Sequence, residues 1–168
     1  MKLMSKLQKR KEELKKDNKG FSLVELIIVI AIMAILVGIV GTQVIPYINK
    51  SKEAKDFQII NSYGTAATTA YSTYAEKTTD KTTVIMGGTN ADAAGKPALT
   101  LQKEIETLTG YNAISVLTGK MGSTKGKSIK AIKIIIDPVT DKTITTQAYS
   151  DTACTAGKEV FEQVVTQL

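Results

Sequence analysis

The sequence predicts an α+β protein in which one long N-terminal helix, from about residue 21 to about residue 74, packs by its second half on a small antiparallel β-sheet. Two observations lead to this prediction. An unbroken apolar stretch runs into an amphipathic helical pattern, and later in the chain two β-prone segments flank a turn-rich connector. The length of 168 residues suits one folded domain with an added tail or anchor.

The apolar stretch covers residues 21–45 and contains a single charged side chain, Glu25. About 25 residues of helix span roughly 37 Å, which is enough to cross a bilayer. Buried strands are much shorter, so this stretch is predicted to be helical. Glycine is unfavourable inside a helix, and proline removes a backbone donor and clashes with the preceding turn. We therefore expect a kink or an unwound segment at Gly38, Gly41 and Pro46.

The helical pattern continues beyond the apolar stretch as a stripe with alternating steps of three and four residues. The stripe consists of Phe57, Ile60, Gly64, Ala67, Tyr71 and Tyr74. It predicts one apolar face that packs on a sheet, with Tyr63, Tyr71 and Tyr74 in the core. Between the two apolar parts lies a polar collar, formed by Lys50, Lys52, Glu53, Lys55 and Asp56.

The remaining chain is predicted to supply the sheet and its connections. Residues 129–136 and 143–149 are β-prone and flank the turn-rich connector 137–142, which predicts a hairpin. A short strand is expected at Val84–Met86 inside a loop region, and residues 119–126 are expected to form a loop.

Two further segments are short. Leu101, Ile105 and Leu108 are spaced four and three apart, which predicts a helix that ends near Gly110. Residues 157–168 fit either a last strand or a short helix, and periodicity leaves both open.

The net charge of +6 is concentrated at the N-terminus. Residues 1–20 hold eight Lys or Arg against three acidic residues, a net of +5, whereas the rest holds 14 basic and 13 acidic residues. A basic segment before an apolar run is typical of a cytoplasmic flank. Since the positive charge is not spread over a folded surface, we expect no direct nucleic-acid binding.

The residue types argue against catalysis. The chain has no His and a single cysteine, Cys154, so histidine-based acid–base chemistry and an intramolecular disulfide are excluded. A membrane-anchored enzyme would need a catalytic constellation, and none is visible, so no catalytic residue and no cofactor are predicted. Asp137, Asp141 and Asp151 lack a calcium-ligand spacing, and a hairpin turn explains the first two; no metal site is predicted.

Glu25 needs an explanation of its own. A secretory signal has a shorter apolar core followed by a small-residue cleavage site, which this chain lacks. In a plain membrane anchor, a carboxylate near the bilayer centre costs roughly 2.5–3.5 kcal/mol, unless it is solvated at the headgroup level. A cut between Gly20 and Phe21 would create an ammonium four residues away and remove the basic segment. In a helix bundle such a charge pair would set the axial register.

Residues 19–26 (Lys-Gly-Phe-Ser-Leu-Val-Glu-Leu), with the apolar run that follows, resemble the prepilin cleavage and methylation motif of type IV pilins and pseudopilins. The resemblance implies that a prepilin peptidase cuts after Gly20 and that Phe21 is N-methylated. It also implies that Glu25 pairs with the Phe21 amine of a neighbouring subunit during assembly. The stretch from Gly38 to Pro46 matches a region that is often unwound in filaments of this family.

The resemblance also implies an organisation and a location. Residues 1–20 would be a leader peptide, 21–45 a transmembrane and filament-core helix, and 46–168 a globular head. The subunit would wait in the cytoplasmic membrane as a single-pass protein with its head outside, and then join a homo-oligomeric helical filament on the cell surface. Its partners would be the prepilin peptidase and the pilus assembly machinery, and adhesion or twitching motility its roles.

Two points stay open under this resemblance. The motif is shared by pseudopilins of type II secretion and DNA-uptake systems, and it does not separate a major from a minor subunit. Gram-negative pilins commonly close a C-terminal loop with a disulfide, whereas Cys154 has no partner cysteine in this chain.

Overall fold

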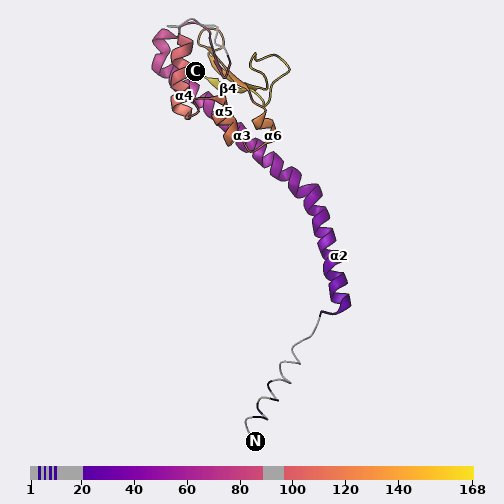
Figure 1. The fold of residues 1–168 in the computed structure, drawn as a ribbon. Helices are drawn as coiled ribbons and strands as arrows, with labels where there is room; N and C mark the ends of the chain where they lie inside the picture. Colours follow the sequence, from indigo (N-terminus) through magenta and orange to yellow (C-terminus); the bar gives the residue numbers. More distant parts are fainter. Residues whose placement is uncertain (1–3, 5, 7, 9, 11–20, 89–96) are drawn as a thin grey trace. The chain divides into compact units, whose positions relative to one another are not determined.

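The computed structural model describes Met4, Lys6, Gln8 and Arg10 together with residues 21–88 and 97–168 (Figure 1). Gly20 and most of the expected leader lie outside the described residues. The chain divides into two compact units, Met1–Pro46 and Tyr47–Leu168. Residues 21–46 are called the stem and residues 47–168 the head.

The stem is helical from α2 (Leu23–Ile39) through the π-helical segment η1 (Val40–Val44) into the first residues of α3 (Ile45–Tyr74). The helical run continues through a 3₁₀ turn, η2 (Ala75–Lys77), so that it extends over 55 residues, Leu23–Lys77. This confirms the long helix predicted from about residue 21 to about residue 74.

The π-helical segment lies directly before Pro46. The Ile45 N–H donates to the Val40 carbonyl, five residues back, and Thr42 Oγ1 donates to the Gly38 carbonyl at 2.9 Å. Proline has no N–H, and its ring presses on the carbonyl four residues earlier, which a wider turn relieves. A kink or unwinding at Gly38, Gly41 and Pro46 stays a prediction.

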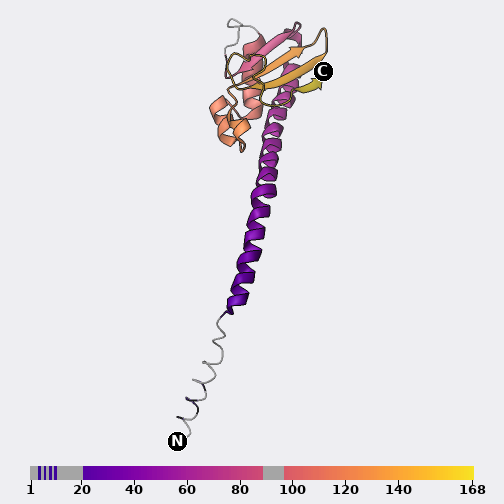
Figure 2. The ribbon, with the colours of Figure 1, turned by 90° about the vertical axis from the view of Figure 1, so that its right-hand side faces the viewer.

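The head contains one antiparallel sheet whose strands follow each other in chain order (Figure 2). They are β1 (Thr82–Met86), β2 (Ala131–Asp137), β3 (Thr143–Tyr149) and β4 (Val164–Gln167). The short strand at Val84–Met86 and the hairpin of 129–136 with 143–149 are confirmed. Residues 164–167 pair with β3, so the C-terminal segment that was left open ends as a strand.

In the described part of the connection from β1 to β2 there are three helices: α4 (Pro97–Thr109), α5 (Ile114–Lys120) and α6 (Thr124–Lys127). The helix predicted to end near Gly110 is confirmed by α4. The loop expected at 119–126 is wrong in part, because that range contains the end of α5 and the first three residues of α6. Ser123 caps α6, its Oγ accepting the Gly126 N–H at 2.8 Å, and hydrophobic spacing does not reveal such a cap.

The second half of the long helix packs on the sheet, as predicted. Ile60 and Ala67 are fully buried, and Phe57, Tyr71 and Tyr74 are partly buried against the same core. Tyr63 is 1% exposed and stacks on Tyr111, and burial raises the pKa of its hydroxyl.

Small residues on α3 allow the helix to approach the sheet closely. A Cβ added at Gly64 would lie 3.5–3.6 Å from side chains of β3 and β4, namely Thr146, Val164 and Thr166. Packing at this distance fixes the position of α3 on the sheet. It therefore also fixes where the N-terminal turns of α3 lie on the surface of the head.

Candidate processing and assembly site

The predicted processing site lies at the start of α2. Phe21 is 84% exposed, and Ser22 has the extended backbone (φ −63°, ψ 141°) of an N-cap residue. Serine is favoured at this position because its hydroxyl oxygen can accept a hydrogen bond from a backbone N–H of the first helical turn. Phe21 therefore stands just outside the helix, where its backbone is accessible. Gly20, its partner in the predicted cut, lies outside the described residues.

Glu25 occupies the third position of α2. Its Oε2 accepts a hydrogen bond from the Ser22 backbone N–H at 2.8 Å, and the helix dipole favours a carboxylate in the first turn. The carboxylate thus binds the backbone N–H of Ser22, the residue that directly follows Phe21. This capping contact is not among the roles expected of Glu25 from the sequence, although the Ser-x-x-Glu pattern of residues 22–25 is its known signal.

This local contact defines what the end of the stem can do chemically. In the uncut chain the Phe21 nitrogen is an uncharged amide, and Glu25 serves as a helix cap. A cut before Phe21 would turn that nitrogen into an ammonium within reach of the capping carboxylate. The pairing of Glu25 with Phe21, in the same or in a neighbouring subunit, remains a prediction.

The outer surface of α2 is apolar on all sides. Each of its large apolar side chains is at least 46% exposed, and no residue of α2 is buried. The helix is long and apolar enough to cross a membrane. A continuous exposed surface of this kind requires cover by lipid or by other helices.

The polar collar predicted between the apolar parts needs a correction at Asp56. The lysines of the collar are exposed, but Asp56 is 1% exposed. Its carboxylate accepts the backbone N–H groups of Gly122 and Ser123, at 2.9 and 2.8 Å, and the Ser123 hydroxyl. Asp56 therefore ties α3 to the α5–α6 connection. The partners are 66 and 67 residues away in the chain, so no local pattern identifies them.

Asp137 and Asp151 accept hydrogen bonds from residues that follow them closely in the chain. Asp137 Oδ1 accepts the N–H groups of Thr140 at 2.8 Å and Val139 at 3.2 Å, and Oδ2 lies 3.1 Å from Lys81 Nζ. The Thr140 N–H, together with Lys81 and the Val139 N–H, holds the pKa of Asp137 below its ordinary value. Asp151 accepts from the N–H and the hydroxyl of Thr155.

The remaining reactive groups of the head are scattered. Within residues 21–88 and 97–168, no three His, Cys, Asp or Glu side chains gather as a metal site would require. Cys154 is partly buried, and burial raises the pKa of its thiol.

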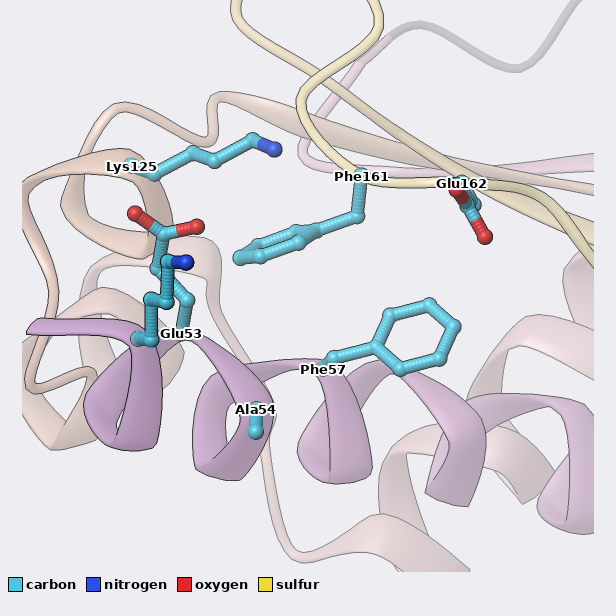
Figure 3. A pocket seen from close by; sticks show the side chains of 7 residues that line it. Glu53, Ala54, Phe57, Lys125, Phe161 and Glu162 are labelled. Atoms are coloured by element: carbon cyan, nitrogen blue, oxygen red, sulfur yellow. The ribbon is translucent and has the colours of Figure 1, made fainter. Parts of the chain in front are cut away.

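A pocket of about 290 Å³ opens at the N-terminal turns of α3 within the head (Figure 3). The Phe57 and Phe161 rings lie 6.0 Å apart, and Lys125 Nζ lies 5.0 Å from the centroid of the Phe161 ring. Lys50, Glu53, Ala54 and Glu162 complete the lining. The lining combines two ammonium groups, two carboxylates and two aromatic rings, and includes no hydroxyl, thiol or imidazole.

Comparison with protein families identifies the N-terminal part of the chain. Residues 15–41 match the family model described as the prokaryotic N-terminal methylation motif. The matched range contains the predicted cleavage site, Glu25 and all of α2. No curated protein and no solved structure matches the chain significantly.

Proposed function

We propose that this chain, which carries the N-terminal signature of type IV pilins and pseudopilins on a pilin-like long helix with a small sheet, is the precursor of a type IV pilus subunit. It is cleaved after Gly20, N-methylated at Phe21 and polymerised through its apolar helix into a cell-surface filament. The observation that carries the proposal is the methylation motif on the apolar helix α2, none of whose residues is buried by the described part of the chain. The motif implies processing by a prepilin peptidase and favours a structural subunit over an enzyme.

Before assembly, the subunit crosses the cytoplasmic membrane once, with its leader inside and its head outside. The net charge of +5 on residues 1–20 supports this orientation, because basic flanks stay in the cytoplasm. Cleavage removes that charge, which could not be buried between packed helices.

Glu25 and the Phe21 amine guide assembly by charge pairing. When stems pack together, an unpaired carboxylate in an apolar interior would cost several kcal/mol. Pairing with the ammonium of a neighbouring subunit avoids this cost at only one axial offset between the helices. The capping contact with the Ser22 N–H holds the carboxylate at the helix tip, where such a neighbour can reach it.

The proposal is tested by comparing surface filaments from cells that produce the unchanged chain and the Glu25→Ala variant. We expect Glu25→Ala to be processed normally but to lower the yield of sheared filaments at least about tenfold, since one buried charge loses its partner. Glu76→Ala removes an exposed carboxylate of the head and should leave the yield unchanged.

Two outcomes would contradict parts of the proposal. Normal filaments from the Glu25→Ala chain would refute the charge-pairing role. Imaging of the sheared material separates a pilin from a pseudopilin: long fibres support the pilus subunit, and their absence alongside a correctly processed chain would favour a subunit of a secretion or DNA-uptake system.

A further inference from the structure

Six exposed lysines lie on two segments of the head that are far apart in the chain. Three follow the stem directly in α3, and three lie between the end of α5 and the end of α6. This set, called the basic patch, consists of Lys50, Lys52, Lys55, Lys120, Lys125 and Lys127.

The fold joins the two segments into one surface. A Cβ at Gly122 would lie 3.5 Å from Lys52 Cγ, so the Lys52 side chain runs along the α5–α6 connection. Lys50 of α3 and Lys125 of α6 line the same pocket. The Asp56 hydrogen bonds to Gly122 and Ser123 hold the segments together.

The charge of this surface differs in sign from that of the rest of the head. Residues 47–56 and 120–127 contain six lysines and two acidic residues, a net of +4, while the other residues of 47–168 contain eight lysines and ten acidic residues, a net of −2. One of the two acidic residues, Asp56, is buried and fully engaged by hydrogen bonds. Among the described residues, none of the six lysines has an ion-pair partner within 4.0 Å.

We propose that the basic patch binds the phosphate headgroups of an anionic membrane surface while the subunit waits in the membrane. This inference rests on the proposed function, which puts the head outside a membrane-spanning stem. Lys50 follows the last residue of the apolar stretch, Ile45, by only five positions. Tyr47, between them, is 75% exposed, and tyrosine favours the headgroup level of a bilayer.

The position of the lysines supports a lipid partner. Lysine is depleted on the non-cytoplasmic flank of membrane spans, so three lysines within six residues there run against the usual bias. Long lysine side chains reach the lipid phosphates from just above the apolar layer, and several together attract anionic lipid strongly.

The aromatic residues of the patch argue against nucleic acid. Binding of single strands uses exposed rings on which bases stack. Phe161 is 8% exposed and lies under the Lys125 ammonium, while Phe57 faces Phe161. Phe161 is nearly buried and Phe57 is partly buried, so neither ring offers the fully exposed face that base stacking requires.

The test uses the full chain in vesicles with a single fluorescent reporter. The chain contains no Trp, so Val116→Trp in α5 gives one signal; Val116 is 44% exposed and lies four residues before Lys120, on the same helix face. Quenching by a headgroup-labelled lipid is compared between neutral phosphatidylcholine vesicles and vesicles that contain phosphatidylglycerol. We expect at least about twofold stronger quenching with phosphatidylglycerol, which 0.5 M salt abolishes because screening shortens to a few ångströms.

Matched variants assign the effect to the patch. Replacing Lys120, Lys125 and Lys127 by Gln in the reporter chain should reduce quenching to the neutral-vesicle level. Replacing three exposed lysines elsewhere by Gln, namely Lys77, Lys103 and Lys142, changes the net charge equally and should preserve the phosphatidylglycerol effect. Equal quenching in both vesicle types, or equal loss in both triple variants, would overturn the proposal.

Two further readouts keep the possible failures apart. If patch-dependent quenching is absent but the patch lysines are needed to bind a short DNA duplex, the surface is a nucleic-acid site and the proposal is wrong. Flotation tests the anchor itself: a chain that does not float with neutral vesicles contradicts the membrane part of the proposed function. A chain that floats but ignores phosphatidylglycerol contradicts only the role of the patch.

Discussion

Apolar side chains have opposite surroundings in the stem and in the head. In α2 each large apolar side chain is at least 46% exposed, whereas Ile60, Leu101 and Ile134 of the head are 0% exposed. The head buries its apolar surface within its own chain, so its stability comes from internal packing. The stem has no such cover among the described residues, so lipid or other subunits must supply it.

The carboxylates Asp56 and Glu25 show the same contrast. Asp56 is buried in the head, and its hydrogen-bond donors come from the same chain. Glu25 is exposed at the tip of the stem and accepts one local N–H. We infer that the head is complete before assembly and that the strongest partner of Glu25, the Phe21 ammonium, arises only after cleavage.

The largest expected difference concerns buried apolar volume. Ile60→Ala should lower the free energy of unfolding of the head by about 2–5 kcal/mol, because it leaves a cavity in the core. Ile30→Ala, in the exposed stem, should leave it unchanged. Denaturant unfolding of both variants in detergent micelles, followed by near-ultraviolet circular dichroism of the tyrosines, measures this. Equal losses would refute the independence of head and stem.

The next effect concerns Asp56. We expect Asp56→Ala to destabilise the head by about 3 kcal/mol, since three donors lose a charged, buried acceptor. Glu53 lies three residues earlier, and its side chain is less buried than that of Asp56. Glu53→Ala should therefore change the unfolding free energy by less than about 0.5 kcal/mol. The same unfolding assay applies. A small effect at Asp56 would mean that the α5–α6 connection is held by other contacts.

A smaller effect is expected from two glycines near this connection. A Cβ at Gly126 would overlap the Asp56 carboxylate, so Gly126→Ala should cost about 1–3 kcal/mol of head stability. A Cβ at Gly119 meets nothing within 4 Å, and Gly119→Ala inside α5 should stabilise by up to about 1 kcal/mol. Thermal unfolding of the two variants should therefore shift in opposite directions, and a shift in the same direction would contradict the assigned packing.

The smallest effect is a pH dependence from Asp137. Its pKa in the folded head lies below the ordinary value of about 4, because the Thr140 N–H and Lys81 stabilise the carboxylate. The stabilisation is therefore fully present above pH 4 and is lost as the pH falls through the lowered pKa. Melting temperatures between pH 2 and 7 should fall less steeply on acidification in Asp137→Asn. Lys81→Gln should keep part of the slope, because the Thr140 N–H still stabilises the carboxylate, and a slope lost equally in both variants would point to the ion pair alone.

The sequence predicted those parts of the fold that depend on local periodicity. The stripe from Phe57 to Tyr74 and the hairpin of residues 129–149 follow from spacing that one short segment contains. The strand at residues 164–167 was undecided because four residues carry too little pattern, and pairing with β3 decides it. The helix α6 was not predicted, since a Ser123 cap and the contact with Asp56 stabilise it rather than an apolar face.

The candidate sites differ in the same way. Gly20, Phe21 and Glu25 were recognisable because the motif is contiguous, and the family model matches the same stretch. The buried state of Asp56 and the joining of the basic patch depend on contacts between residues more than 60 positions apart, which one sequence does not reveal. The Ser22–Glu25 capping contact can be predicted from the local Ser-x-x-Glu pattern, whereas the sequence-based prediction considered only the charge of Glu25.

We expect the stem to become an assembly element only after a cut between Gly20 and Phe21. Intact mass and N-terminal sequencing of the chain in sheared surface filaments show whether this cut has occurred. The expected chain begins at N-methylated Phe21 and lacks residues 1–20. Filaments whose subunits retain Met1–Gly20 would contradict it.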